Sequence, residues 1–527
     1  MDPVELSLFA SRIRAVCDEM GAQLQRAAFS PNVRDRLDFS CAVFDAQGAL
    51  CAQAAHIPVH LGSMAYAMTD IVRMLEWAPG DMVMLNDPFL GGTHLPDVTM
   101  VAPLFEAGRL MGFVANRAHH ADIGAETPGS MPVSRSLAEE GILIPPTHVA
   151  RQGQVLDEVL EAVTRATRNP RDAAGDFAAQ LAANRRGLER LSALVRAMGV
   201  AGYGRALEAL QDYGERLALH ALARIPDGAY RFEDVLDDDG LGHADIPIRV
   251  CVRAEAGRVE VDFTGTASQV AGNLNCPLSV TAAGVYYVFR CLMPAQTPAC
   301  AGSFRPITLR AAPGSLLHAR RPAAVAAGNV ETSTRVVDVL LGALAQALPE
   351  AIPAASHGSM NNVAMGASGD APWGYYETLG GGMGAGPRGG SWSGVQTHMT
   401  NTRNTPVEVL ELRHPLRIRR YALRRGSGGA GRRPGGDGLV REYEFLEAAE
   451  FTLLTERRRH APWGLAGGAP GRPGANFLND RPLPGKVHGR VRPGDRLRIE
   501  TPGGGGWGRP PADDGDDPGM NDDRGMS

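Results

Sequence analysis

The sequence contains almost no lysine, since Lys486 is the only one among its 527 residues. The common phosphate-binding loop has the pattern Gly-x-x-x-x-Gly-Lys-Ser/Thr and uses its lysine to contact nucleotide phosphates. Lys486 lies outside all three glycine-rich runs, at 380–384, 426–438 and 503–506. The sequence therefore excludes a lysine-dependent ATP site and leaves only an arginine-based one open. If the reaction consumes ATP, we expect another polypeptide to bind the nucleotide.

Paired cysteines and long apolar runs are also missing. The seven cysteines include no Cys-x-x-Cys pair, which predicts reduced and mostly buried thiols. Cys276 could act as a nucleophile, but a small core side chain is the favoured interpretation. No apolar run approaches the roughly 20 residues of a membrane helix, and the first residues lack the basic and apolar regions of a signal peptide. We expect a cytoplasmic protein without a membrane segment.

No excess of basic charge is present either. The formal net charge of −5 gives no electrostatic footprint for nucleic acid. Short arginine runs at 424–425, 432–433 and 457–459 are interpreted as solvated or partner-facing charge. With 44% hydrophobic and 21% charged residues, the chain has the composition of an ordinary globular protein with a sizeable core.

What the sequence does contain is a group of histidines and carboxylates around one predicted β-hairpin. Strand-like segments at 98–105 and 110–115 are joined by a turn-like segment at 106–109. The polar group at the two open ends comprises Asp87, His94, Asp97, His119, His120 and Asp122. Neutral imidazole and carboxylate are the ligands that divalent transition metals prefer. The pattern predicts a metal site, with hydrogen-bonded turn residues as the alternative.

The register of the hairpin decides which histidine faces Asp97. A turn centred between Ala107 and Gly108 makes paired residue numbers sum to 215, which places Asp97 on the face of Ala118 and His120. A three-residue loop gives a sum of 216 and favours His119 instead. The spacing alone leaves both registers open.

Elsewhere the chain alternates between helical and strand-like patterns, which predicts an α+β fold: a mixed, strand-rich, multi-lobed chain whose antiparallel hairpins carry the metal site and are flanked by helices. Helices are expected near 6–24, 61–75, 157–167, 171–198, 281–291 and 336–348, and strands near 38–53, 250–261, 439–454 and 486–500. The expected regions are a metal-binding catalytic region at 1–200, a mixed α/β region at 201–372, a glycine-rich and strand-rich region at 373–510 and a disordered tail at 511–527.

One predicted helix carries a row of polar residues. Asp176, Gln180 and Asn184 recur one turn apart on the same face of the helix at 171–198. Such a row either lines a site or forms a solvated helix face, and the two interpretations carry equal weight.

Several long motifs give the chain a family resemblance. The stretch His94-Leu95-Pro96-Asp97 and the pair His119-His120 belong to matching segments. The segments are 36–45, 86–97, 116–124, 262–266, 400–408 and 501–508, together with Asp176, Gln180 and Asn184. In these segments the chain resembles the hydantoinase B family, which includes the B half of 5-oxoprolinase, caprolactamase B and related acetone and acetophenone carboxylase subunits. The matches are in order and run over nearly the whole chain.

The resemblance implies a ligand set for one divalent ion, and Zn, Mn and Fe all accept two histidines with two carboxylates. Carried over residue by residue, the metal ligands are Asp38, His94, Asp97 and His119, which selects the register with His119. His120 and Asp122 are the expected catalytic residues, as neighbours that orient ligands or transfer protons.

The resemblance also implies a two-part reaction. An A-type ATPase subunit would bind ATP and Mg and phosphorylate the oxygen of a small cyclic amide. This chain, as the B-type component of a hetero-oligomer, would supply the metal that activates water to hydrolyse it. Two alternatives are a metal-binding subunit of an ATP-dependent ketone carboxylase and a non-catalytic scaffold.

Overall fold

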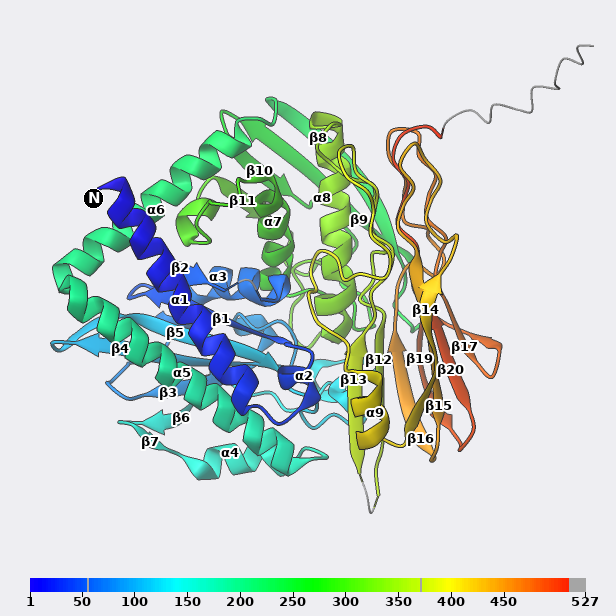
Figure 1. Cartoon of the computed structure of the whole chain (residues 1–527), viewed down its shortest axis with the longest axis horizontal. Coiled ribbons are helices and arrows are strands. Elements are labelled where there is room, and N and C mark those ends of the chain that lie inside the picture. The colour runs from blue at the N-terminus through cyan, green and yellow to red at the C-terminus, as the bar shows by residue number, and fades with distance from the viewer. Residues whose placement is uncertain (55, 370–371, 511–527) are drawn as a thin grey trace, which may run out of the picture.

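The computed structural model describes residues 1–54, 56–369 and 372–510, so the tail predicted to be disordered (511–527) lies outside the described residues. Within them, the chain forms four β-sheets flanked by helices (Figure 1). The helices are α1 (Pro3–Ala27), α2 (Pro31–Arg34), α3 (Pro58–Arg73), α4 (Asp157–Thr164), α5 (Pro170–Met198), α6 (Val200–Leu222), α7 (Leu278–Leu292), α8 (Ser333–Ala347) and α9 (Val407–Arg413), with short turns that include η1 (Pro88–Leu90) and the π-helical η5 (Gly328–Thr332). The strands are β1 (Phe39–Asp45), β2 (Leu50–Gln53), β3 (Met82–Leu85), β4 (Asp97–Glu106), β5 (Arg109–His119), β6 (Thr147–Arg151), β7 (Gln154–Val155), β8 (Gly228–Asp238), β9 (Ala244–Glu255), β10 (Arg258–Asp262), β11 (Ile307–Arg310), β12 (Asn362–Ala367), β13 (Trp373–Thr378), β14 (Leu416–Arg424), β15 (Gly438–Phe445), β16 (Ala449–Leu454), β17 (Ala475–Leu478), β18 (Arg481–Leu483), β19 (Lys486–Val491) and β20 (Arg496–Glu500).

The first sheet has the strand order β2-β1-β5-β4-β3-β6-β7, and its pairings are antiparallel. Helices α1 and α5 cross one face of this sheet (Figure 1), and α3 packs on the other. Side chains alternate between faces along a strand. In β1, Cys41 and Val43 therefore join the apolar cluster under α1 and α5, whereas Ala42 and Phe44 join the cluster around α3. The central strands are buried on both sides, which holds them rigidly.

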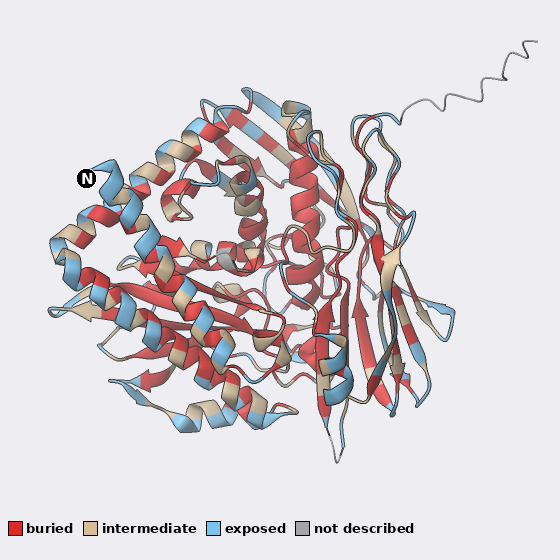
Figure 2. Cartoon of the chain, in the orientation of Figure 1, coloured by how far each residue is buried: buried red, intermediate tan, exposed pale blue. Residues whose placement is uncertain are grey.

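The remaining sheets build the rest of the core. The sheet β11-β10-β9-β8 packs on α8, which is buried along most of its length (Figure 2). The sheets β13-β12-β16-β19 and β14-β15-β20-β17-β18 share a third apolar cluster between them. The α+β class with antiparallel sheets is thus confirmed. The sequence analysis predicted no helix at the position of α6. The division into four regions stays a prediction.

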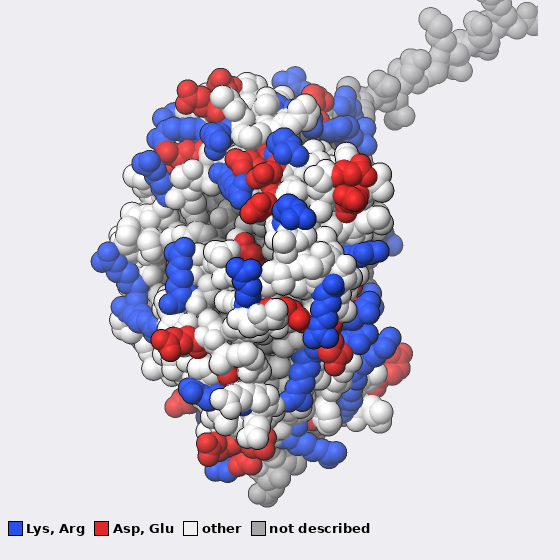
Figure 3. Space-filling model, turned by 90° about the vertical axis from the view of Figure 1, so that its left-hand side faces the viewer, with Lys and Arg blue, Asp and Glu red and all other residues white. Residues whose placement is uncertain are grey.

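The surface carries charges of both signs. On the face shown in Figure 3, basic and acidic side chains are intermixed. Of the helices in the described part of the chain, none combines the length and apolar character needed to cross a membrane.

The hairpin β4–β5 combines features of both registers that the sequence left open. At its tip, Glu106 pairs with Arg109 around a two-residue turn whose central residues, Ala107 and Gly108, have φ of +50° and +72°. Positive φ at both positions is the signature of a tight hairpin turn. An irregularity between Leu104 and Phe105 then adds one residue to β5, so that the pairing sum changes from 215 to 216. As a result, Asp97 lies opposite His119.

Gly112, at this irregularity, has φ of +155°, and a Cβ there would lie 2.3 Å from the carbonyl oxygen of Phe44. We expect Gly112→Ala to lower the free energy of unfolding by about 1–3 kcal/mol through steric displacement of β5, in addition to backbone strain. Gly108→Ala is the matched control, because its φ is also positive but a Cβ there meets nothing within 4 Å. Its cost should be confined to about 1–2 kcal/mol. Denaturant unfolding of both variants tests this, and equal losses would contradict the steric argument.

Candidate metal centre

Three of the four predicted ligands lie side by side at one end of the first sheet. Asp97 is the first residue of β4 and His119 is the last residue of β5. Asp38 directly precedes β1, and the His119 amide donates to the Asp38 carbonyl at 3.0 Å. Because laterally paired residues point to the same face of a sheet, these three side chains share one face. The sequence did not show that β1 and β5 are neighbours.

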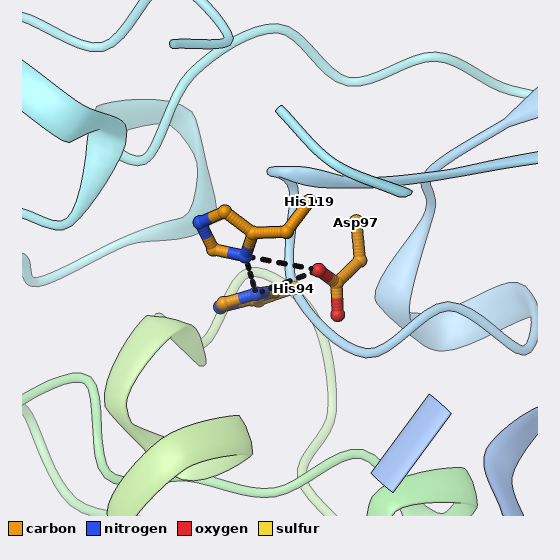
Figure 4. Close-up of side chains that lie close together, drawn as sticks. All are labelled: His94, Asp97 and His119. Atoms are coloured by element: carbon orange, nitrogen blue, oxygen red, sulfur yellow. Dashed lines mark hydrogen bonds and ion pairs between the residues drawn. The ribbon is translucent and has the colours of Figure 1, made fainter. Parts of the chain in front are cut away.

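His94 reaches the same point from the loop before β4, where a turn joins the Asp97 amide to the His94 carbonyl at 3.1 Å. Its Nε2 lies 3.2 Å from Asp97 Oδ1 and 3.3 Å from His119 Nδ1, and His119 Nδ1 lies 3.1 Å from the same oxygen (Figure 4). All three side chains are buried, with exposures of 0%, 0% and 3% for His94, Asp97 and His119. The structure thus brings together His94, Asp97 and His119, three of the six polar residues predicted at the open ends of the hairpin.

These three atoms fit a divalent metal ion. Two ligands at about 2.0–2.1 Å from one tetrahedral ion are about 3.3–3.4 Å apart, close to the distances observed. His94 Nδ1 lies 3.3 Å from the carbonyl oxygen of Ala326, which can only accept, so Nδ1 carries the proton and Nε2 presents a lone pair. Two imidazole nitrogens and a carboxylate oxygen converge on one point, as the coordination of a transition metal requires.

The electrostatics of the cluster are dominated by burial and by the attraction between Asp97 and the histidines around it. Burial alone would lower the pKa of His94, but the neighbouring Asp97 carboxylate reverses this direction. Burial alone would raise the pKa of Asp97, but the charges of His60 and His94 and the hydrogen bonds with His119 and His60 lower it. The pKa of His94 is therefore raised, and that of Asp97 is held well below its usual range. Burial lowers the pKa of His119, which favours the neutral imidazole that a metal ligand needs.

Asp38, the fourth predicted ligand, lies beside this cluster. Its Oδ2 is 3.6 Å from Arg36 Nη2, and its Oδ1 is 3.9 Å from His60 Nε2. It is outside the group of three residues whose ligand atoms lie within 4.8 Å of one another. Its role as a ligand stays a prediction that the family resemblance supports.

His60, which the sequence analysis did not single out, lies between the two aspartates. It comes from the first turn of α3, and its Nε2 is 3.2 Å from Asp97 Oδ2. The same oxygen accepts a hydrogen bond from the Thr93 hydroxyl. The available signal was positional, since His60 precedes Met64 by one turn on the apolar face of α3. A buried histidine between carboxylates holds them in place as an outer-sphere partner does.

Two further residues come from distant parts of the chain. Tyr376 of β13 stacks on His119, with ring centroids 4.8 Å apart and planes at 13°. Asn329, in η5, places its Nδ2 3.5 Å from Asp97 Oδ2. Single π-helical turns occur often at functional sites. The cluster is thus enclosed by segments that no local motif connects to it.

The structure does not bring the two predicted catalytic residues to this cluster. His120 belongs to the other face of the sheet, where its Nε2 lies 2.9 Å from Gln180 Oε1 and its ring stacks on Phe177. Asp122 accepts hydrogen bonds from the Ser130 hydroxyl at 2.8 Å and from the Arg168 amide at 2.8 Å. Both have structural partners, so the geometry favours a supporting role for each over direct proton transfer.

The polar row on α5 is buried rather than solvated or site-lining. Asp176 Oδ1 accepts from the amides of Phe29 and Ser30, at 2.8 and 3.0 Å. Gln180 and Asn184 donate to carbonyl oxygens of β4 and hydrogen-bond with Asn116 of β5. The row therefore fixes α5 on the sheet. Cys276 is a buried core residue, and burial raises the pKa of its thiol.

Fold and site together define an α+β protein with a candidate transition-metal centre at the end of an antiparallel sheet. Comparison with known families identifies the family to which this α+β protein belongs. The family model described as hydantoinase B/oxoprolinase matches residues 2–510. The chain belongs to this family, as the sequence motifs predicted.

Individual relatives agree with this assignment. Across 96% of its length the chain is 41% identical to 5-oxoprolinase 1 of Arabidopsis thaliana, of which it spans only 42%. It is 32% identical to a protein of Pseudomonas sp. (strain NS671) that is provisionally named as the B component of a D-/L-hydantoinase, covering 97% of this chain and 90% of that one. The crystal structure of ATP-dependent caprolactamase from Pseudomonas jessenii matches with a TM-score of 0.91 at 27% identity, over 97% of this chain and 92% of that chain.

Metal content separates the two adjacent histidines. We expect the purified protein to hold about one divalent ion per chain, and His119→Asn to lose it because an amide oxygen is a poorer ligand than imidazole. His120→Asn should keep the ion, since His120 is bonded to Gln180 on the other face, and should lose some stability. Elemental analysis of both variants checks this. Loss of the ion in His120→Asn with retention in His119→Asn would place the metal site on the opposite face of the sheet, beside α5.

His60 should tune the affinity of the site without being required for it. Removing an outer-sphere partner typically costs 10–100-fold in metal affinity, and we expect a loss of about this size in His60→Ala. His148→Ala is the matched control, because His148 Nε2 lies 3.7 Å from Asp81, an aspartate outside the cluster. Competition with a chelator measures both affinities, and an unchanged value for His60→Ala would show that Asp97 needs no support from α3.

Proposed function

We propose that this chain is the metal-binding, hydrolytic B-type component of an ATP-dependent cyclic amide hydrolase of the hydantoinase or 5-oxoprolinase type. The main support for this proposal is the convergence of His94, Asp97 and His119 on one buried point. The names of the relatives, which include a 5-oxoprolinase and an ATP-dependent caprolactamase, supply the class of reaction.

In this proposal, His94, Asp97 and His119 hold one divalent ion, Zn, Mn or Fe, with Asp38 as the fourth ligand. Such an ion, when bound, lowers the pKa of a water molecule towards neutrality. Thr93 and His60 hold Asp97 Oδ2, so that Oδ1 is the oxygen left to face the two imidazoles. Preorganised polar groups in a water-excluded site act more strongly than they do in water.

The ATP-dependent step is assigned to a partner. An amide carbonyl is a poor electrophile, and phosphorylation of its oxygen by an A-type subunit, which would bind ATP and Mg, makes it reactive. Lys486 is buried and its Nζ lies 2.6 Å from Glu456 Oε1, so it is committed to an ion pair. The chain also covers only about two-fifths of the Arabidopsis 5-oxoprolinase. Both facts support a division of labour within a hetero-oligomer.

The complex with an A-type subunit tests this division. We expect no ATP hydrolysis by the chain alone and lactam-stimulated hydrolysis by the complex. In that complex, Asp97→Asn should lower product formation by at least about 100-fold, because losing a ligand exceeds the cost of losing an outer-sphere partner. ATP consumption should fall much less. Product and phosphate are measured in the same reaction.

Two outcomes would contradict this assignment. Robust ATP hydrolysis by the isolated chain would remove the need for the partner. Turnover of a ketone that depends on bicarbonate, with none on lactams, would assign the same site to the carboxylase alternative.

A further inference from the structure

A cavity of about 820 Å³ lies one layer of side chains away from Asp38. Leu37, which directly precedes Asp38, lines it together with Thr402. The Thr402 hydroxyl is 2.8 Å from that of Thr378, which accepts from Arg36, and Arg36 in turn lies 3.6 Å from Asp38. Asp38, at 6% exposure, is the least buried of the predicted ligands. The cavity is therefore placed to deliver a small molecule to that edge of the site.

The lining of the cavity combines two kinds of side chain. The apolar ones include Leu37, Ile57, Met383, Trp392 and Val395, and the polar ones include Gln396, Asn401, Arg403 and Asn404. Among the described residues that line the cavity, none is acidic and Arg403 alone carries a permanent charge. This combination suits a small, partly apolar ring that bears a negative charge.

Arg403 is held in place by its neighbours but has no partner of its own. Thr402 and Asn404 are both tied to β13, since Asn404 Nδ2 donates to Glu377 Oε2 at 2.6 Å and Thr402 bonds Thr378. The Arg403 amide donates to the carbonyl of Arg36 at 2.9 Å. In residues 1–54, 56–369 and 372–510, no side chain accepts a hydrogen bond from its guanidinium or forms an ion pair with it. A fixed loop thus presents an unpaired guanidinium to the cavity, and guanidinium recognises carboxylate and phosphate oxygens in a bidentate manner.

We propose that this cavity is the binding site for an anionic substrate and that Arg403 is its specificity-determining residue. The oxyanion is either a carboxylate on the lactam ring or the phosphoryl group of the activated lactam, which share the same recognition chemistry. In this proposal the apolar side chains pack against the ring, and Leu37 places that contact next to Asp38. The identity of the substrate rests on the proposed function, whereas the cavity and its positive charge are observed independently of that function.

Steady-state kinetics of the complex with the A-type subunit test the role of Arg403. The substrates are 5-oxoproline, which carries a ring carboxylate, and 2-pyrrolidinone, the same ring without it. Arg403→Gln should raise KM for 5-oxoproline at least about tenfold, the effect of losing a charge-assisted bond, while kcat changes little. An effect on 5-oxoproline alone identifies the carboxylate, and an equal effect on both substrates identifies the phosphoryl group. Metal content should stay unchanged.

Arg413→Gln is the matched control. Arg413 is also exposed, lies on α9 just after the same loop, and forms no ion pair within the described residues, but it does not line the cavity. Arg403→Lys should retain part of the affinity, since it keeps the charge and loses the bidentate geometry. Kinetic behaviour of Arg403→Gln that matches Arg413→Gln would overturn the proposal.

A binding measurement on the isolated chain keeps this test separate from the proposed function. Calorimetry with 5-oxoproline and with inorganic phosphate should detect binding to the wild-type chain that Arg403→Gln weakens at least about tenfold. If the complex hydrolyses no lactam but this binding is present and depends on Arg403, the reaction class is wrong and the anion site stands. If the wild-type chain binds neither anion, or Arg403→Gln binds equally well, the anion site is wrong.

Discussion

The burial of one ionised carboxylate, that of Asp97, is the constraint on which the rest of the site depends. Such a group is costly to remove from water unless its oxygens find partners. Asp97 Oδ1 faces His94 and His119, while Oδ2 accepts from Thr93 and lies beside His60. These partners come from a loop, from β5 and from α3, so a single buried charge joins three separate elements of the chain. The histidines hold its pKa low although burial would raise it.

The sheet gives this charge a fixed position. Asp38, Asp97 and His119 stand at the ends of adjacent strands of an antiparallel sheet that is covered on both faces, and a site on rigid elements keeps its geometry better than one on loops. The irregularity near Gly112 is what brings His119, rather than Ala118, opposite Asp97. The anion cavity is built differently. Most of its polar side chains belong to a loop. Thr402 and Asn404 of this loop are hydrogen-bonded to β13, so a neighbouring sheet holds the loop in place.

The features that could be predicted from the sequence are those determined by residues close together in the chain. The turn at Ala107 and Gly108 follows from local turn chemistry, and the α+β class from strand and helix periodicity. The extra residue in β5 has no local signature, so the residues alone left the register open and only the family resemblance selected His119. The contact between β1 and β5 and the stacking of Tyr376 are non-local pairings that periodicity does not encode. The same limit applies to His120. Its partner Gln180 belongs to the polar row on α5, but the sequence did not show that this row faces His120.

If the proposed metal centre holds an ion, the stacking of Tyr376 on His119 links the exchange of that ion to the docking of the C-terminal sheets. Tyr376 lies on β13, far along the chain from the hairpin that carries the ligands. During synthesis the hairpin is complete long before β13 exists, so an ion entering at that stage meets ligands open to water. Once β13 has docked, Tyr376 covers the His119 ring, and freeing that ring requires local opening of a packed interface, whose free energy sets the population of the open state. The lifetime of the proposed ion on the protein would therefore be a property of the whole fold, and not only of the side chains that hold it.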